Sequence, residues 1–125
     1  GDMKFEEHVE IVGHCAKKMY MSIHKARQNN IDFEVHIESR RRYLGDYGTY
    51  SEVYVGDARL ISGVTSPLNN EEIQKLRKEI EEASYELESA LNIAMKDRYS
   101  FDIRGAIFDD DVVVDICVNG SNVTI

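Results

Sequence analysis

The stretch that decides the fold is residues 69–96, NNEEIQKLRKEIEEASYELESALNIAMK. Its apolar residues recur at alternating steps of three and four, which places them on one stripe of an α-helix. The stripe consists of Ile73, Leu76, Ile80, Ala83, Leu87, Ala90 and Ala94. At about 1.5 Å per residue this helix would be roughly 40 Å long.

The start of this helix carries specific signals. Asn69 is a capping residue type, and Glu72 follows at the position that a capping box requires. Leu68 and Ile73 occupy the two positions of a hydrophobic staple. We therefore expect the helix to begin directly after Asn69.

The apolar seam has two interpretations. Residues Ile73, Leu76, Ile80, Ala83 and Leu87 can form a core stripe lying on a sheet, or they can form the contact of a homodimer. The alanines permit close approach of another helix but bury little area each. The sequence leaves both interpretations open.

The rest of the chain alternates between strand patterns and turns. Residues 3–28 predict a first helix with Asp2 as its cap and Asn29 and Asn30 at its end. Strands are predicted at 31–38, 50–55, 58–64, 99–104 and 112–118, with a last short strand at 121–125. Residues 39–49 read as a connection, Gly56-Asp57 and Asn119-Gly120 as hairpin turns, and 109–111 as an acidic turn.

These elements predict one α+β domain over residues 1–125 with the order α-β-β-β-α-β-β and a final β. Two helices would cover one face of a mostly antiparallel sheet, giving two layers. An internal α-β-β-β repeat is an alternative origin of this order. At an offset of 68 residues, Val12 aligns with Ile80 and Met19 with Leu87.

The composition narrows the class of protein. The net charge of −8 and the pI near 4.9 argue against general nucleic-acid binding, which requires positive charge. No apolar run is long enough for a membrane span, and no signal peptide is visible. Cys15 and Cys117 form no C-x-x-C pair, so we expect thiols in a reducing, cytoplasmic compartment.

The most distinctive surface candidate is the segment 40–50. It combines three of the fifteen basic residues with several tyrosines: Arg40, Arg41, Arg42, Tyr43, Tyr47 and Tyr50. Guanidinium groups bind phosphate or carboxylate, and tyrosines stack on rings, so this segment is a hypothetical site for a ligand or partner. The alternative is a long exposed hairpin whose arginines pair with Glu38, with Glu52 or with the acidic helix.

Catalytic and metal signatures are absent from the sequence. It has no Gly-x-Ser-x-Gly, no P-loop and no dinucleotide glycine pattern, and its histidines lack metal-ligand spacing. We expect no cofactor and no metal. A small enzyme with an unrecognised pocket stays an alternative, because distant residues can assemble a site.

The element order and the acidic charge resemble those of the small dimeric chaperones of type III secretion, although the third helix of that family has no counterpart here. The resemblance implies a homodimer that binds another protein. We therefore expect a non-enzymatic adaptor or chaperone-like module, with binding of nucleic acid or phosphate through residues 40–50 as the alternative.

Overall fold

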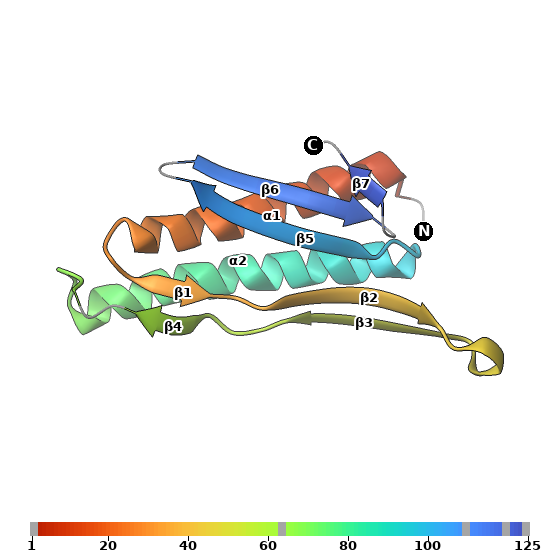
Figure 1. Cartoon of the computed structure of the whole chain (residues 1–125), viewed down its shortest axis with the longest axis horizontal. Helices are drawn as coiled ribbons and strands as arrows, with labels where there is room; N and C mark the ends of the chain where they lie inside the picture. The colour runs from red at the N-terminus through yellow and green to blue at the C-terminus, as the bar shows by residue number, and fades with distance from the viewer. Residues whose placement is uncertain (1–2, 63–64, 109–110, 119–120, 124–125) are drawn as a thin grey trace.

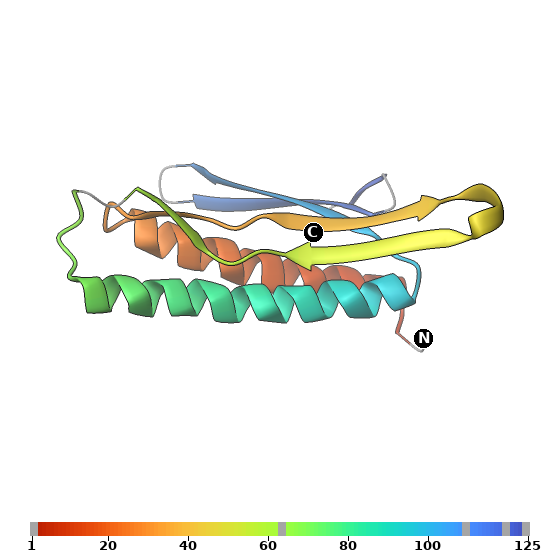
Figure 2. The same cartoon turned by 90° about the horizontal axis from the view of Figure 1, so that it is seen from below.

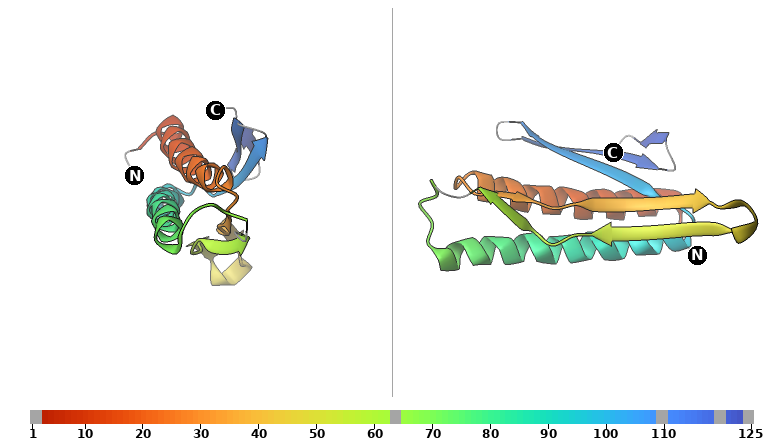
Figure 3. Two further views of the ribbon diagram at one scale, coloured as in Figure 1. Left: turned by 90° about the vertical axis from the view of Figure 1, so that its left-hand side faces the viewer. Right: turned by 60° about the horizontal axis from the view of Figure 1, so that its bottom comes forward.

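Two long antiparallel helices form one layer, and the strands lie together on one side of them (Figures 1, 2 and 3). The computed structural model describes residues 3–62, 65–108, 111–118 and 121–123. The elements are α1 (Phe5–Arg27), β1 (Asp32–Glu34), β2 (Ile37–Tyr43), η1 (Gly45–Tyr47), β3 (Thr49–Val55), β4 (Arg59–Ser62), α2 (Asn70–Lys96), β5 (Phe101–Phe108), β6 (Asp111–Val118) and β7 (Ser121–Val123).

The predicted start of α2 is confirmed. The Asn69 side chain accepts a hydrogen bond from the Glu72 amide at 2.8 Å, and the Asn69 amide donates to the Glu72 carboxylate at 3.4 Å. Both bonds of a capping box are therefore present. α1 begins without such a cap, because Lys4 occupies its N-cap position and makes no side-chain bond there. The predicted cap Asp2 lies outside the described residues.

The core forms where the two helices meet each other and the strands. α1 buries Val12, Ala16, Met19 and other residues of its predicted stripe, and α2 buries Leu76, Ile80, Ala83, Leu87, Leu91 and Ala94. The strands add Phe33, Phe101 and Ile116. Each large apolar side chain buried in this way contributes about 1.5–3 kcal/mol, so the seam is a main source of stability.

A buried polar contact joins the start of α1 to the end of α2. Nε2 of His8 lies 2.6 Å from Oδ2 of Asp97, and the His8 side chain is only 2% exposed. The Tyr99 ring packs beside His8 and Phe5, with centroid distances of 5.5 and 5.1 Å. This contact fixes the longitudinal alignment of the helices at one end.

Both helices end with the same hydrogen-bond pattern. The Ile31 amide donates to the carbonyl of Ala26, and the Tyr99 amide donates to the carbonyl of Ala94. Asn30 and Arg98 precede these amides in the left-handed conformation, with φ of 58° and 68°. These Schellman-type ends are 68 residues apart, the offset seen in the sequence. The strands that follow α1 and those that follow α2 pair in different ways. The similarity observed is therefore limited to the helix ends, and a repeat of the whole α-β-β-β unit stays a prediction.

The strands form three small antiparallel sheets, and the prediction of one sheet was wrong in this respect. β1 pairs with β4, β2 pairs with β3, and β5, β6 and β7 pair in that order. β5 meets β2 at one end, where the Phe101 amide donates to Ser39 Oγ at 3.4 Å. Beyond that point the two ribbons diverge, as the right panel of Figure 3 shows. The predicted last strand is confirmed over Ser121–Val123, which form β7, and its residues 124–125 lie outside the described part of the chain.

The predicted connection at residues 39–49 is instead the outer half of a hairpin. β2 pairs with β3 from Ile37↔Val55 to Tyr43↔Thr49, and the chain reverses at η1. The reversal uses Gly45 and Gly48 at φ of 63° and 87°, which favour glycine.

The predicted hairpin turn at Gly56-Asp57 was wrong. β3 continues past it in the same direction into β4, which pairs with β1 through Glu34↔Arg59. Between this pair and Ile37↔Val55, two residues on one strand face three on the other, so the extra residue is absorbed as a bulge. The Gly56 amide donates to the His36 carbonyl at 2.8 Å and joins both halves into one bent ribbon.

The Tyr20 ring of α1 lies directly against the backbone of Gly105 in β5. A Cβ atom at position 105 would approach three ring carbons of Tyr20 to 2.3–2.4 Å. Burial raises the pKa of the Tyr20 phenol, and a backbone hydrogen bond with Gly105 acts in the opposite direction. The Tyr20 ring can therefore lie this close to β5 only because residue 105 has no side chain, a role that glycines in strands often have.

We expect Gly105→Ala to lower the free energy of unfolding by about 1–3 kcal/mol, because the new methyl group overpacks against Tyr20. Urea denaturation measures the change. In a Tyr20→Ala background the same substitution should cost less, with a coupling of at least about 0.5 kcal/mol. Strictly additive effects would contradict this contact.

We also expect an alkaline loss of stability that depends on Tyr20. Because its pKa is higher in the folded chain, the full stability is present below about pH 10, the unfolded value, and is lost as pH rises through the folded pKa. Urea unfolding of Tyr20→Phe between about pH 9 and pH 11 should show a smaller decline than wild type. Tyr85→Phe, at an exposed position, is the control and should behave as wild type.

Candidate functional site

The segment predicted as a binding loop forms the tip of the β2–β3 hairpin. Figures 1 and 2 show that this tip extends beyond the C-terminal end of α2. Leu44 and Tyr47 are exposed there, and Tyr47 is 93% exposed. The hairpin tip is therefore an arm that neighbouring elements leave uncovered.

The arginines of this arm differ in their environment. Arg40 faces Glu52 across the hairpin, and its Nε and Nη2 donate to Glu52 Oε2 at 3.0 and 2.9 Å. These hydrogen bonds and the charge of Glu52 raise the pKa of the Arg40 guanidinium. Arg41 is exposed. The side chains of Arg42 and Tyr43 lie outside the described part of the chain.

The outward face of β3 alternates aromatic and acidic side chains. Tyr50 and Tyr54 are 48% and 50% exposed, with Glu52 between them. The His36 ring lies 6.2 Å from the Tyr54 ring, and its Nε2 is 3.2 Å from the Glu38 carboxylate. This face combines rings with paired charges of both signs and is not a uniformly basic patch.

The helix seam proposed as a core or dimer contact lies inside the chain. Leu76, Ile80, Ala83 and Leu87 are buried, and Ile73 is partly buried against the same core. These side chains contact the interior of their own chain and are not presented to solvent.

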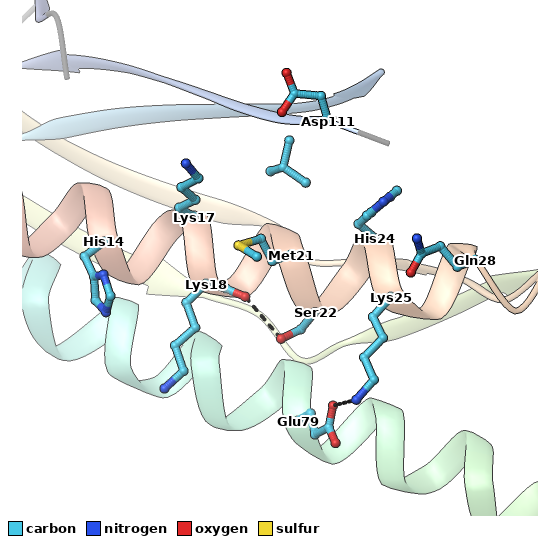
Figure 4. Close-up of a pocket in the computed structure, with 11 residues that line it drawn as sticks. His14, Lys17, Lys18, Met21, Ser22, His24, Lys25, Gln28, Glu79 and Asp111 are labelled. Carbon is cyan, nitrogen blue, oxygen red and sulfur yellow. Dashed lines mark hydrogen bonds and ion pairs between the residues drawn. The ribbon is translucent and has the colours of Figure 1, made fainter. Parts of the chain in front are cut away.

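An open groove of about 760 Å³ runs along α1 (Figure 4). Most of its side chains project from α1, between Glu79 of α2 and Asp111 of β6. They include His14, Lys17, Lys18, Met21, Ser22, His24, Lys25 and Gln28. The sequence analysis missed this groove, although basic residues and histidines at helical spacing on an acidic chain were a usable signal.

The polar side chains of the groove differ in their hydrogen bonds. Lys25 Nζ lies 3.2 Å from the Glu79 carboxylate, and the Ser22 hydroxyl donates to the Lys18 carbonyl at 3.1 Å. Nδ1 of His24 is buried without a hydrogen-bond partner in the described part. In the described part of the chain, the hydrogen bond of the one lining hydroxyl, Ser22, goes to a backbone carbonyl and not to a histidine.

The cysteines are both half-buried. Burial, and then the nearby Glu86 carboxylate, raise the pKa of the Cys15 thiol, whereas Lys18 acts in the opposite direction. A thiol held in its protonated form is a poor nucleophile, so Cys15 is unsuited to thiolate chemistry.

A smaller cleft of about 380 Å³ is lined by residues of α1, β1, β4 and β5. Tyr20 and Ile23 of α1 line it from the helix layer, and Phe33 and Gly105 line it from the two ribbons. Its other lining residues are Arg27, Glu34, Val35, Ile61, Ala106 and Ile107. Sequence analysis did not find this cleft, because it exists only where two separately paired ribbons fail to meet.

The described residues contain neither a candidate metal site nor a helix suited to span a membrane. Within the described ranges, no group of three His, Cys, Asp or Glu side chains is arranged to hold a metal ion. Neither of the described helices combines the length and apolar character that a membrane span requires.

Comparisons with known proteins gave no relative for this chain. No protein-family model matches it, and neither the search of curated proteins nor the search of solved structures found a match. The function proposed below is therefore derived from the surfaces of the chain itself.

Proposed function

We propose that this chain is a non-enzymatic protein-binding module of the adaptor or chaperone type, and that the tip of the β2–β3 hairpin is its binding surface. The observation that supports this proposal is the uncovered aromatic arm. Tyr47 is 93% exposed, and Tyr50 is about half exposed beside it. Tyrosine and arginine are the residues that most often carry binding energy at protein interfaces.

The charges of the hairpin favour a protein over a nucleic acid. Arg40 is already neutralised by Glu52, and Glu38 lies on the same ribbon. The whole chain carries a net charge of −8. A phosphate backbone would be repelled by this charge, whereas a protein interface accommodates mixed charges around aromatic side chains.

A second copy of the chain is the first partner to consider. The seam of α2 is occupied by the core, so two copies could not meet through it without opening the fold. The hairpin arm is accessible without such a change. We therefore propose that a homodimer, if it forms, uses the arm.

The test is a double substitution, Tyr47→Ala with Tyr50→Ala. We expect at least about tenfold weaker association, which corresponds to the loss of about 1.4 kcal/mol or more. Sedimentation equilibrium measures self-association, and affinity capture from cells of the source measures binding to other proteins. Tyr85→Ala removes an exposed tyrosine from α2, with an exposure close to that of Tyr50, and is the control.

Two outcomes would contradict this proposal. One is equal association of wild type, control and double variant in both assays. The other is association that falls steeply between about 50 and 200 mM salt and survives loss of the tyrosines, which would favour phosphate contacts by the arginines.

A further inference from the structure

We propose that the outer edge of β3 pairs with the same edge of a second copy of this chain, in antiparallel register about Ser51. This inference rests on the proposed function, in which the hairpin arm is the binding surface, and it states how two arms would meet. It follows from the direction of the β3 backbone groups, the position of the strand in the fold and the charges of the hairpin.

The backbone groups of β3 alternate between two directions. The Leu44 amide donates to the Gly48 carbonyl at 2.7 Å, and the Gly56 amide donates to the His36 carbonyl at 2.8 Å. The register of β2 with β3 between these two bonds has no break. In an antiparallel pair alternate residues face the partner strand, so the even-numbered residues of β3 face β2. The N–H and C=O groups that point away from β2 belong to Thr49, Ser51, Val53 and Val55.

This outer edge of β3 is open over Ser51 and Val53. In the described part of the chain, no hydrogen bond reaches the backbone of either residue from the side away from β2. Figure 1 shows β3 at the lower rim of the molecule, and no described element lies beyond it on that side. Ser51 is exposed and Val53 is partly buried, whereas Val55 is buried and ends the open stretch.

An open edge of this kind is complementary to itself. The stretch from Thr49 to Val53 is centred on Ser51, so an antiparallel second copy can pair with it symmetrically. Ser51 then lies opposite Ser51 of the second copy, and Thr49 lies opposite Val53 of the second copy. Each of these pairs can exchange two main-chain hydrogen bonds, because these residues already point their N–H and C=O groups outward.

The side chains on the outward face of β3 fit the same register. Tyr50, which is 48% exposed, would lie opposite Glu52 of the second copy. Glu52 is already paired with Arg40 at 2.9 Å, so the tyrosine ring would lie beside a neutralised pair. No carboxylate of β3 would face a carboxylate directly, which is the arrangement that destabilises cross-strand pairing.

The hairpin is the electrically neutral part of an acidic chain. Between residues 37 and 55, three arginines balance the carboxylates of Glu38, Asp46 and Glu52, whereas the whole chain carries a net charge of −8. The strand β6 instead exposes Asp111 and Asp115. Two copies would therefore repel each other less at their hairpins than at β6.

The test is hydrogen exchange of individual amides of the wild-type chain, followed by NMR at two concentrations. Because a contact of this length is small, we expect a weak dimer with a Kd of about 100 µM. The Ser51 and Val53 amides should exchange about threefold more slowly at about 1 mM than at about 20 µM chain, because only the monomer leaves them open. The Arg41 amide, which faces the opposite edge of the hairpin, should not change.

Two substitutions at residue 51 make the test specific. Ser51→Pro removes the outward N–H at the centre of the contact and no bond to β2, so the dimer should weaken at least about tenfold in sedimentation equilibrium. Ser51→Ala keeps that N–H, is the matched control and should associate as wild type does. Slow exchange of the Glu52 amide, which faces β2, verifies the hairpin in both variants. If Ser51→Pro does not fold, the exchange measurement on the wild-type chain decides.

The proposal is overturned if the wild-type chain is monomeric at about 1 mM, a concentration that a contact of this size must reach. It is also overturned if a dimer forms while the Ser51 and Val53 amides exchange at the monomer rate, or if Ser51→Pro associates as tightly as Ser51→Ala.

These failures are distinguishable from failure of the proposed function. A chain that is monomeric but captures other proteins through Tyr47 and Tyr50 would overturn only the strand pairing. Protected Ser51 and Val53 amides, together with unchanged association of the Tyr47→Ala, Tyr50→Ala variant, would support the pairing and contradict only the role of the tip.

Discussion

The antiparallel contact between α1 and α2 is the constraint on which the rest of the structure depends. Both helices bury alanines, Ala16 in α1 and Ala83 in α2, and such small side chains permit close packing. The His8–Asp97 contact aligns the helices at one end, and Lys25 with Glu79 bridges them near the other. The exposed Lys25 pair adds little free energy, whereas the buried apolar seam supplies most of it.

Because the two helices together provide one continuous apolar surface for packing, the strands need not form one continuous sheet. Each ribbon buries its apolar side chains against the helices on its own, through Phe33 in one and Phe101 in the other. The Tyr20 ring lies over Gly105, where the side chain of any other residue would project from β5. The result is a cleft between the ribbons and a hairpin that extends past its helical support.

Sequence patterns predicted the helices well and the strand partners poorly. The steps of three and four, together with the Asn69 cap, reflect interactions within one helix, and α2 begins where they indicate. The arginine and tyrosine segment was found from composition, but its pairing of Arg40 with Glu52 depends on hairpin register. The cleft carries no motif, since its walls combine α1 and β1 with β4 and β5, which come much later in the chain.

By itself, the sequence determined two amphipathic helices, strands that alternate apolar and polar residues, and an acidic surface, because each depends on neighbours a few residues away. Only the tertiary structure decided that β3 pairs with β2 and not with β4, and that β5 stands apart from β1. Those outcomes depend on which distant side chains compete for one space. One such side chain is Tyr20, whose ring fills the space that a side chain at position 105 would need, and no local pattern records that contact.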